Sequence, residues 1–200
     1  MPLIVRDSGG GDFTPLAEGV HVAVCNLVCD CGIQPGGRFK ARSKLYIRWE
    51  VPGERISWTG ADMNEHQGPA QIGKFYTSSL SQKAKLRRDL EAWRGRAFSA
   101  EELAGFDVLQ ILGAACQLMV THSTGADGRV YANLNGVMGL PRGVTRPKAE
   151  RALVKYSPDE RALFDELPEW LQQKVRDGQA APPDPARSVG LDDFDDDIPF

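Results

Sequence analysis

A row of alternating cations in residues 38–48 is the feature of this sequence that most directly suggests chemistry. Every second position carries a positive charge or a phenol ring: Arg38, Lys40, Arg42, Lys44, Tyr46 and Arg48. Because successive side chains of a strand point to opposite faces, all of these would share one face, with neighbours about 6.6 Å apart. That spacing is close to the phosphate repeat of an extended nucleic acid strand. The row therefore predicts a surface that binds a phosphate backbone, on which Tyr46 can stack against a base.

Two further groups extend this pattern. Lys74 and Tyr76 repeat the spacing of a cation and a tyrosine, and Trp58 is another candidate for stacking, although a core tryptophan explains it equally well. A basic sheet face with interleaved aromatic rings suits sequence-tolerant binding of single strands, because phosphate neutralisation and stacking both contribute affinity. Double-stranded DNA and RNA are the alternative ligands. The sequence shows no helix-turn-helix, zinc-finger or RNP-type motif that favours them.

The last residues of the sequence carry a second kind of chemistry. Residues 192–200 read Asp-Asp-Phe-Asp-Asp-Asp-Ile-Pro-Phe, which places five aspartates beside an apolar end. Such a peptide is too highly charged and too poor in apolar side chains to fold alone. An apolar pocket with a basic rim could bind the Phe200 ring, its terminal carboxylate and the aspartates. A solubilising tail is the simpler alternative, but it does not require Ile-Pro-Phe.

The same segment resembles the C-terminal tip of bacterial single-stranded DNA-binding proteins, which typically ends Asp-Phe-Asp-Asp-Asp-Ile-Pro-Phe. The match covers that pattern without a gap: Asp193, Phe194, Asp195, Asp196, Asp197, Ile198, Pro199 and Phe200. The resemblance implies that these residues bind partner proteins of DNA replication, recombination and repair.

The distribution of charge divides the chain into a basic and an acidic part. Residues 151–200 contain 6 Lys and Arg against 12 Asp and Glu, whereas residues 1–150 contain 18 against 15. A mildly basic body followed by an acidic segment is typical of a polyanion-binding domain with a separate interaction tail. Residues 1–11 have no apolar core of signal-peptide length, and the sequence has no apolar stretch long enough to span a membrane. We therefore expect a cytoplasmic protein.

The four cysteines and three histidines do not form a recognisable metal or catalytic motif. In a strand, Cys25, Cys29 and Cys31 would share one face, with Cys25 and Cys29 about 13 Å apart, which is too far for one zinc ion. We expect reduced, mostly buried thiols and no cofactor. The sequence has no HExxH, Walker or Gly-x-Ser-x-Gly motif. A nuclease site could be built from Asp62, Glu65 and His66, but a polar surface loop explains these residues better. These features predict a protein that is not an enzyme.

The elements that would position these residues follow from hydrophobic periodicity. Apolar or alternating segments predict extended structure at residues 20–28, 38–51, 55–79, 116–122 and 129–138, the third of them less regular and broken near residues 64–69. A period of 3.6 residues predicts a helix over residues 81–93 that ends near Gly95. Ser99 with Glu102 has the spacing of a capping box, which begins a second, short helix.

Three strands, a helical segment and two further strands are the order of the OB-fold, a five-stranded barrel with its helix between strands three and four. Another small α+β barrel is the alternative. Farther on, Ser157 and Pro168 each have the pattern of a helix start. We expect four segments: a flexible N-terminus (1–14), an OB-fold domain (15–145), a helical extension (146–177), and a disordered linker with the acidic tip (178–200).

The body also resembles a group of bacteriophage and prophage early-region proteins that are thought to be single-stranded DNA-binding OB-fold proteins. The similarity spans about residues 13–142, with its main segments at Pro15–Cys25, Leu86–Gly95 and Tyr131–Leu134, and it also includes Leu167–Lys174. It departs at Cys29 and Cys31. A homo-oligomer is compatible with the sequence, but the tetramer of cellular single-strand-binding proteins is not implied, because the body does not follow their sequences.

These resemblances and the cation row lead us to expect a phage-type protein that coats and protects single-stranded DNA and recruits genome-maintenance proteins through its tip. Two alternatives remain. The protein could be a recombination mediator that anneals complementary strands or loads an annealing protein. It could also be an interaction module that mimics the host tip and occupies the same pockets without needing DNA.

Overall fold

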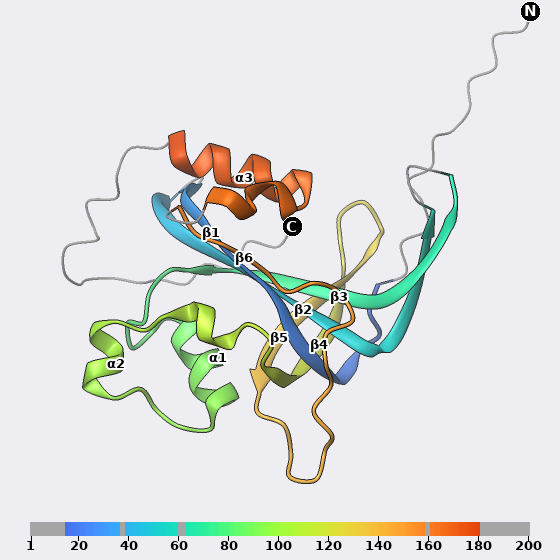
Figure 1. Ribbon diagram of the computed structural model, residues 1–200, viewed down its shortest axis with the longest axis horizontal. Coiled ribbons are helices and arrows are strands. Elements are labelled where there is room, and N and C mark those ends of the chain that lie inside the picture. The colour runs from blue at the N-terminus through green and yellow to red at the C-terminus, as the bar shows by residue number, and fades with distance from the viewer. Residues whose placement is uncertain (1–14, 37–38, 60–62, 159–160, 181–200) are drawn as a thin grey trace, which may run out of the picture.

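The computed structural model of the chain describes residues 15–36, 39–59, 63–158 and 161–180 (Figure 1). The elements in chain order are β1 (Gly19–Gly36), β2 (Phe39–Thr59), β3 (Glu65–Thr77), α1 (Lys85–Arg94), α2 (Ala100–Ala104), the 3-10 helix η1 (Val108–Ile111), β4 (Ala115–Thr124), β5 (Val130–Met138), β6 (Val154–Tyr156), the 3-10 helix η2 (Arg161–Glu166) and α3 (Glu169–Ala180).

Five antiparallel strands form one sheet that curls into a half-barrel. The strand order is β3–β2–β1–β4–β5, and α1 lies between β3 and β4 in the chain. Strand β1 is central, because β2 pairs along one of its edges and β4 along the first part of the other. The short strand β6 runs parallel to β1 and pairs with Leu27–Cys29, beyond the end of β4. Strands β3 and β5, at the two ends of the path, come into contact as the sheet curls.

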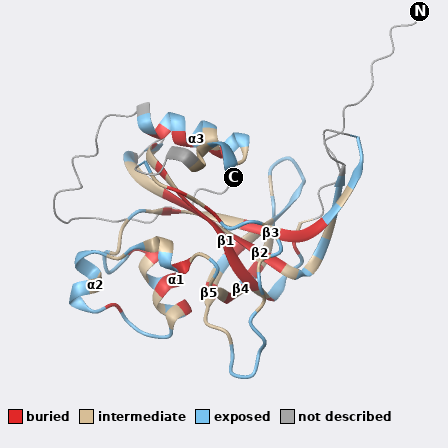
Figure 2. Ribbon diagram, viewed as in Figure 1, coloured by how far each residue is buried: buried red, intermediate tan, exposed pale blue. Residues whose placement is uncertain are grey.

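The inner side of the sheet, which faces α1, holds the main hydrophobic core. Ile47 and Trp49 of β2 are buried there. Helix α1 covers this side with Leu86, Leu90 and Trp93, which lie at helical spacing on one face. Burial of each such side chain contributes about 1.5–3 kcal/mol. Figure 2 shows the buried residues concentrated in the middle of the sheet and on α1.

The outer side of the sheet faces α3, and Figure 1 shows α1 and α3 on opposite sides. Leu171 and Val175 of α3 are buried against Leu27 and Cys31 of β1 in a second hydrophobic cluster. The approach is close, because a Cβ added to Gly178 would lie 1.9 Å from the Cys31 carbonyl oxygen. A larger residue at position 178 would force α3 away from the sheet. Within the described residues, no helix combines the length and apolar composition needed to cross a membrane.

A register shift at Asn26 changes which side of the sheet each part of β1 faces. The pairing with β2 slips between Cys25 and Leu27, as in a β-bulge. The extra residue reverses the alternation, so Cys25 is buried in the inner core whereas Cys29 and Cys31 are buried in the outer cluster. The prediction that these three cysteines share one face is therefore wrong. All four cysteines are free and buried, and burial raises the pKa of the Cys25 thiol to about 12.

Most predicted elements are confirmed, and several strands are longer than predicted. The region predicted as extended over residues 55–79 is divided between the end of β2 and the whole of β3. The break predicted near residues 64–69 is wrong, because residues 65–69 pair with β2 as the first part of β3. The helix predicted to begin at Ser157 is the 3-10 helix η2 in the described residues, and α3 continues to Ala180, into the segment predicted as a linker. Residues 146–177 also contain strand β6, which the sequence pattern did not indicate.

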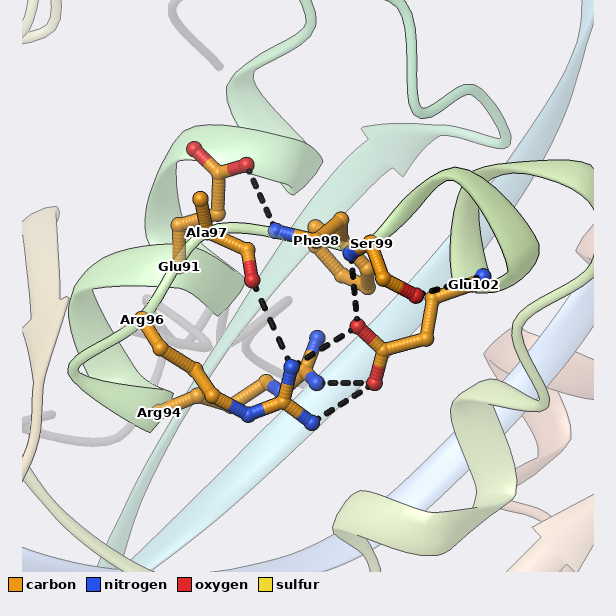
Figure 3. A network of polar contacts seen from close by, with 7 residues as sticks. All are labelled: Glu91, Arg94, Arg96, Ala97, Phe98, Ser99 and Glu102. Carbon is orange, nitrogen blue, oxygen red and sulfur yellow. Dashed lines mark hydrogen bonds and ion pairs between the residues drawn. The ribbon is translucent and has the colours of Figure 1, made fainter.

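The junction between α1 and α2 is held by charged groups (Figure 3). Gly95 ends α1 with a φ of 70°, a left-handed conformation that glycine adopts without strain. The predicted capping box at Ser99 and Glu102 is present. Arg94 and Arg96 both donate to the Glu102 carboxylate. The hydrogen bond from Arg96, followed by that from the Ser99 N–H, lowers the pKa of Glu102 to about 2.

Candidate nucleic-acid interface

The predicted cation row follows the outer side of β2, but the structure divides it into dissimilar parts. Arg38 lies outside the described residues. Lys40 is exposed, whereas Arg42 and Lys44 are half-buried, and a register shift near the start of β2 interrupts the alternation around Lys40. The Lys44 ammonium donates to Thr77 Oγ1 of β3 at 2.9 Å. The described cations of the row that have surface exposure thus lie near the beginning of β2.

The Tyr46 ring is covered by other aromatic rings. The residue is only 8% exposed. Its hydroxyl oxygen lies over Gly73 of β3, where an added Cβ would be 1.9 Å away. Phe75 and Trp170 pack on the ring, with centroids 4.8 and 5.1 Å from its own. Burial raises the pKa of Tyr46 to about 12. The expectation that this ring projects into solvent to stack on a base is therefore wrong.

Arg48 belongs to a buried polar cluster. Its Nε donates to Asn26 Oδ1 at 3.1 Å, and Asn26 Nδ2 donates to Glu50 Oε2 at 3.3 Å. Glu50 is fully buried and also accepts the backbone N–H groups of Glu150 and Arg151 at 2.6 and 3.2 Å. A buried carboxylate needs such partners to offset its lost hydration. Burial is also the main cause of the lowered pKa of Arg48. This side chain orders the fold and does not continue an exposed row.

Lys74 and Tyr76 lie on the opposite side of the sheet from Lys44 and Tyr46. In the β2–β3 ladder, Lys74 pairs with Ile47. Paired residues of adjacent strands share a side of the sheet, and Ile47 points into the inner core. The prediction that Lys74 and Tyr76 extend the basic face is therefore wrong. The register pairs Tyr46 with Phe75 and not with Lys74 or Tyr76, so the two Lys-x-Tyr segments face opposite sides of the sheet.

The inner-side Lys74 and Tyr76 bind a carboxylate of α1. The Tyr76 hydroxyl donates to Asp89 Oδ2 at 2.8 Å, and the Lys74 ammonium lies 3.6 Å from the same oxygen. Lys74 also donates to the Leu134 carbonyl oxygen of β5 at 3.1 Å. Its side chain thus bridges β3 and β5, the two ends of the strand path. Burial, followed by the charge of Asp89, holds the pKa of Tyr76 well above its ordinary value.

Trp58 lies at the other end of the β2–β3 ladder from Lys44. Its indole is stacked on the His66 ring, with centroids 5.8 Å apart and an angle of 20° between the planes. The Arg151 guanidinium carbon lies 5.0 Å from the centre of the indole. Trp58 is 37% exposed, which excludes the alternative of a fully buried core tryptophan, and its role in stacking stays a prediction. It is far along the strand from the exposed cations of the row.

Two groups of exposed residues were missed by sequence reasoning. Trp170 of α3 is half-exposed although it packs on Tyr46, a position that only the docking of α3 defines. The connection between β5 and β6 exposes Arg142, Arg146 and Lys148. A signal for this second group was present, because residues 142–148 contain three cations and no carboxylate.

The residues predicted to bind partner proteins, Asp193–Phe200, lie outside the described residues. In the part of the chain that the structure describes, no three His, Cys, Asp or Glu side chains gather in a way that could hold a metal ion. No family model, curated protein or solved structure matches the chain.

Proposed function

We propose that the chain is a single-stranded DNA-binding protein with an OB-fold body. The observation that carries the proposal is the strand order β3–β2–β1–β4–β5 with α1 between β3 and β4. In an OB-fold the first strand pairs with the second and the fourth, and the third and fifth strands meet. Oligonucleotides bind OB-folds on the face of strands two and three, and at the loops that join strands one to two and four to five.

A cation occurs at each of these places, exposed at the two turns and half-buried on the strand. Lys40 lies beside the turn between β1 and β2, and Lys44 lies on the outer side of β2. Arg129, at the turn between β4 and β5, has a side chain that is 71% exposed. Phosphate neutralisation by such residues gives affinity without reading sequence, as a protein that coats single strands requires.

The proposed role is to cover single-stranded DNA during phage replication, recombination or repair in a bacterial cytoplasm. Binding the open form protects it and favours melting of folded-back structure by mass action. Asp193–Phe200 then bind host or phage genome-maintenance proteins that offer an apolar pocket with a basic rim. The support for this second part is the sequence pattern of the tip.

Fluorescence anisotropy titrations with matched single-stranded DNA, double-stranded DNA and RNA oligonucleotides test the proposal. We expect tightest binding to single-stranded DNA, with the logarithm of affinity falling against the logarithm of salt concentration by about 0.7 per phosphate contacted. Equal affinity for the duplex, or an affinity that does not respond to salt, would reject it.

One observation favours a second candidate, the interaction module that mimics the host tip. Because Tyr46 is covered and Arg48 is bound within the protein, the basic surface of β2 is shorter than the sequence predicted. A pure mimic would bind host single-strand-binding partners through residues 191–200 and would bind no DNA. The same titrations, compared with pull-down of those partners by the full chain and by a chain lacking residues 191–200, separate the two candidates.

A further inference from the structure

Trp170 differs from the other tryptophans of the chain because it is half-exposed and no neighbouring ring is stacked parallel to it. Trp49 and Trp93 are buried in the inner core. Trp58 and Trp170 are 37% and 47% exposed. Trp58 already has the parallel His66 ring stacked on it, whereas the two rings that contact Trp170 meet it at steep angles.

The backbone that carries Trp170 is fixed at the start of α3. Leu171 on one side is fully buried, and Leu167, just before the helix, is also buried. The N–H groups of Leu171 and Gln172 both donate to the Pro168 carbonyl, at 2.8 and 3.0 Å. A half-exposed indole on such a rigid turn loses little conformational entropy when it binds a ligand.

The indole rests on two rings of the outer side of the sheet. Its plane lies at 89° to that of Tyr46, with centroids 5.1 Å apart, and at 74° to that of Phe75, with centroids 6.3 Å apart. Neither neighbour is parallel to Trp170, so neither stacks face to face on it. Edge-to-face packing of this kind is a favourable arrangement that holds a ring in one orientation. Tyr46 and Phe75 therefore act as supports for the Trp170 ring.

A half-buried cation lies on the same side of the sheet as this aromatic group. Lys44 is two residues from Tyr46 on the same side of β2, a separation of about 6.6 Å along a strand. Its ammonium is bound to Thr77, which is two residues from Phe75 on β3. Single strands are bound by aromatic rings that stack on bases and by cations on the same surface that contact phosphates, and Trp170 and Lys44 are one residue of each kind.

We propose that Trp170 is a base-stacking residue of the interface, so that α3 forms part of the DNA-binding surface. This inference rests on the proposed function and assigns to Trp170 the stacking role that the sequence suggested for Tyr46. It also places the DNA-contacting surface on the helix that immediately precedes residues 181–200. A bound strand and the segment leading to the tip would then meet at α3.

Tryptophan fluorescence and anisotropy of the full chain, titrated with a labelled oligo-dT, test the inference. Base stacking quenches indole fluorescence, so Trp170→Phe should remove most of the quenching while changing affinity by less than about threefold, because a phenyl ring still stacks. Trp170→Ala should lower affinity by about 5- to 150-fold, the equivalent of one lost stacking contact. Trp58→Phe is the matched control for removing an exposed indole, and thermal melting checks that the variants fold.

The outcomes separate the inference from the function on which it rests. If the unmodified chain does not bind oligo-dT, the proposed function fails. If it binds with salt-sensitive affinity, but Trp170→Phe keeps the full quenching and Trp170→Ala keeps the affinity, the inference alone is overturned. Should Trp170→Ala fail to fold, the fluorescence quenching of Trp170→Phe still tests the inference: loss of most of the quenching supports it, and full quenching overturns it.

Discussion

The sequence Lys-x-Tyr occurs on two neighbouring strands, and the two copies serve different purposes. Lys44 and Tyr46 lie on the outer side of β2, where the lysine is half-buried and the tyrosine packs against Trp170. Lys74 and Tyr76 lie on the inner side of β3, where both approach the buried Asp89. Adjacent strands share a face only through their register, so identical local patterns can end on opposite sides of one sheet.

The comparison separates residues that we propose to contact DNA from residues that hold the half-barrel together. A cation on the outer side costs little to keep, because water still reaches it, and it can exchange a protein contact for a phosphate. A lysine with an aspartate near the core is instead part of the structure, since removing one partner leaves the other charge buried without compensation. We therefore expect changes at Lys74 and Asp89 to alter stability first, and changes at Lys44 to alter DNA affinity first.

Asp89→Ala is expected to have the largest effect on stability. It removes the carboxylate that accepts the Tyr76 hydroxyl and lies next to the Lys74 ammonium. Losing both contacts should lower the free energy of unfolding by about 3 kcal/mol. Urea denaturation followed by circular dichroism measures the loss. Lys44→Ala serves as the comparison on the outer side and should cost less than about 1 kcal/mol. Equal losses for the two variants would remove the distinction between the two sides.

Much of the fold could be predicted from the sequence, because its signals are local. Alternation, the 3.6-residue period and the Ser99–Glu102 capping box identified strands and helices from neighbouring residues alone. The side that each side chain faces could not be predicted in the same way. It depends on the bulge at Asn26, on the pairing of Ile47 with Lys74, and on where α3 docks, and all of these are long-range contacts.

The candidate site shows the same limit. The exposure of Lys40 and part of Trp58 agrees with the sequence pattern, because surface position is often encoded locally. The prediction that the Tyr46 ring is exposed is wrong because Trp170, on a helix more than a hundred residues away in the chain, covers it. Trp170 could not be assigned a role before the aromatic rings under it were known.

Gly73→Ala should have the next largest effect and bears on the outer side. The added Cβ would lie 1.9 Å from the Tyr46 hydroxyl oxygen, so the ring that supports Trp170 must move. We expect a loss of about 1–3 kcal/mol, as for overpacking elsewhere. Gly136→Ala is the matched control in β5, because an added Cβ there meets no atom within 4 Å, and it should stay within about 0.5 kcal/mol. Thermal or urea unfolding of both variants checks the prediction, and a Gly73→Ala protein as stable as Gly136→Ala would contradict it.

A half-buried set of charges at the junction between α1 and α2 should contribute least and gives a contrast with the buried Asp89. The pKa of Glu102 is lowered from 4.5 to about 2, mainly by Arg96. A carboxylate with a lowered pKa in the folded state stabilises it above the ordinary pKa, and that contribution is lost as the pH falls from 4.5 toward 2. The stability difference between the unmodified chain and Glu102→Gln should therefore shrink over this pH range in urea titrations. A difference that stays constant with pH would show that the charge of Glu102 is not what holds the junction.

The most direct measurement compares DNA binding by two charge-reversed chains with the same net charge. Arg42→Glu with Lys44→Glu changes the outer side of β2, and Lys83→Glu with Lys85→Glu changes the start of α1 by the same amount. Anisotropy with oligo-dT over a salt series should show that the β2 variant loses at least about tenfold in affinity and that its salt slope falls by about 0.7 for each lost phosphate contact. The α1 variant should stay close to the unmodified chain. Equal losses in both variants, or none in the β2 variant, would contradict the assignment of the outer side of β2 as the surface that binds single strands.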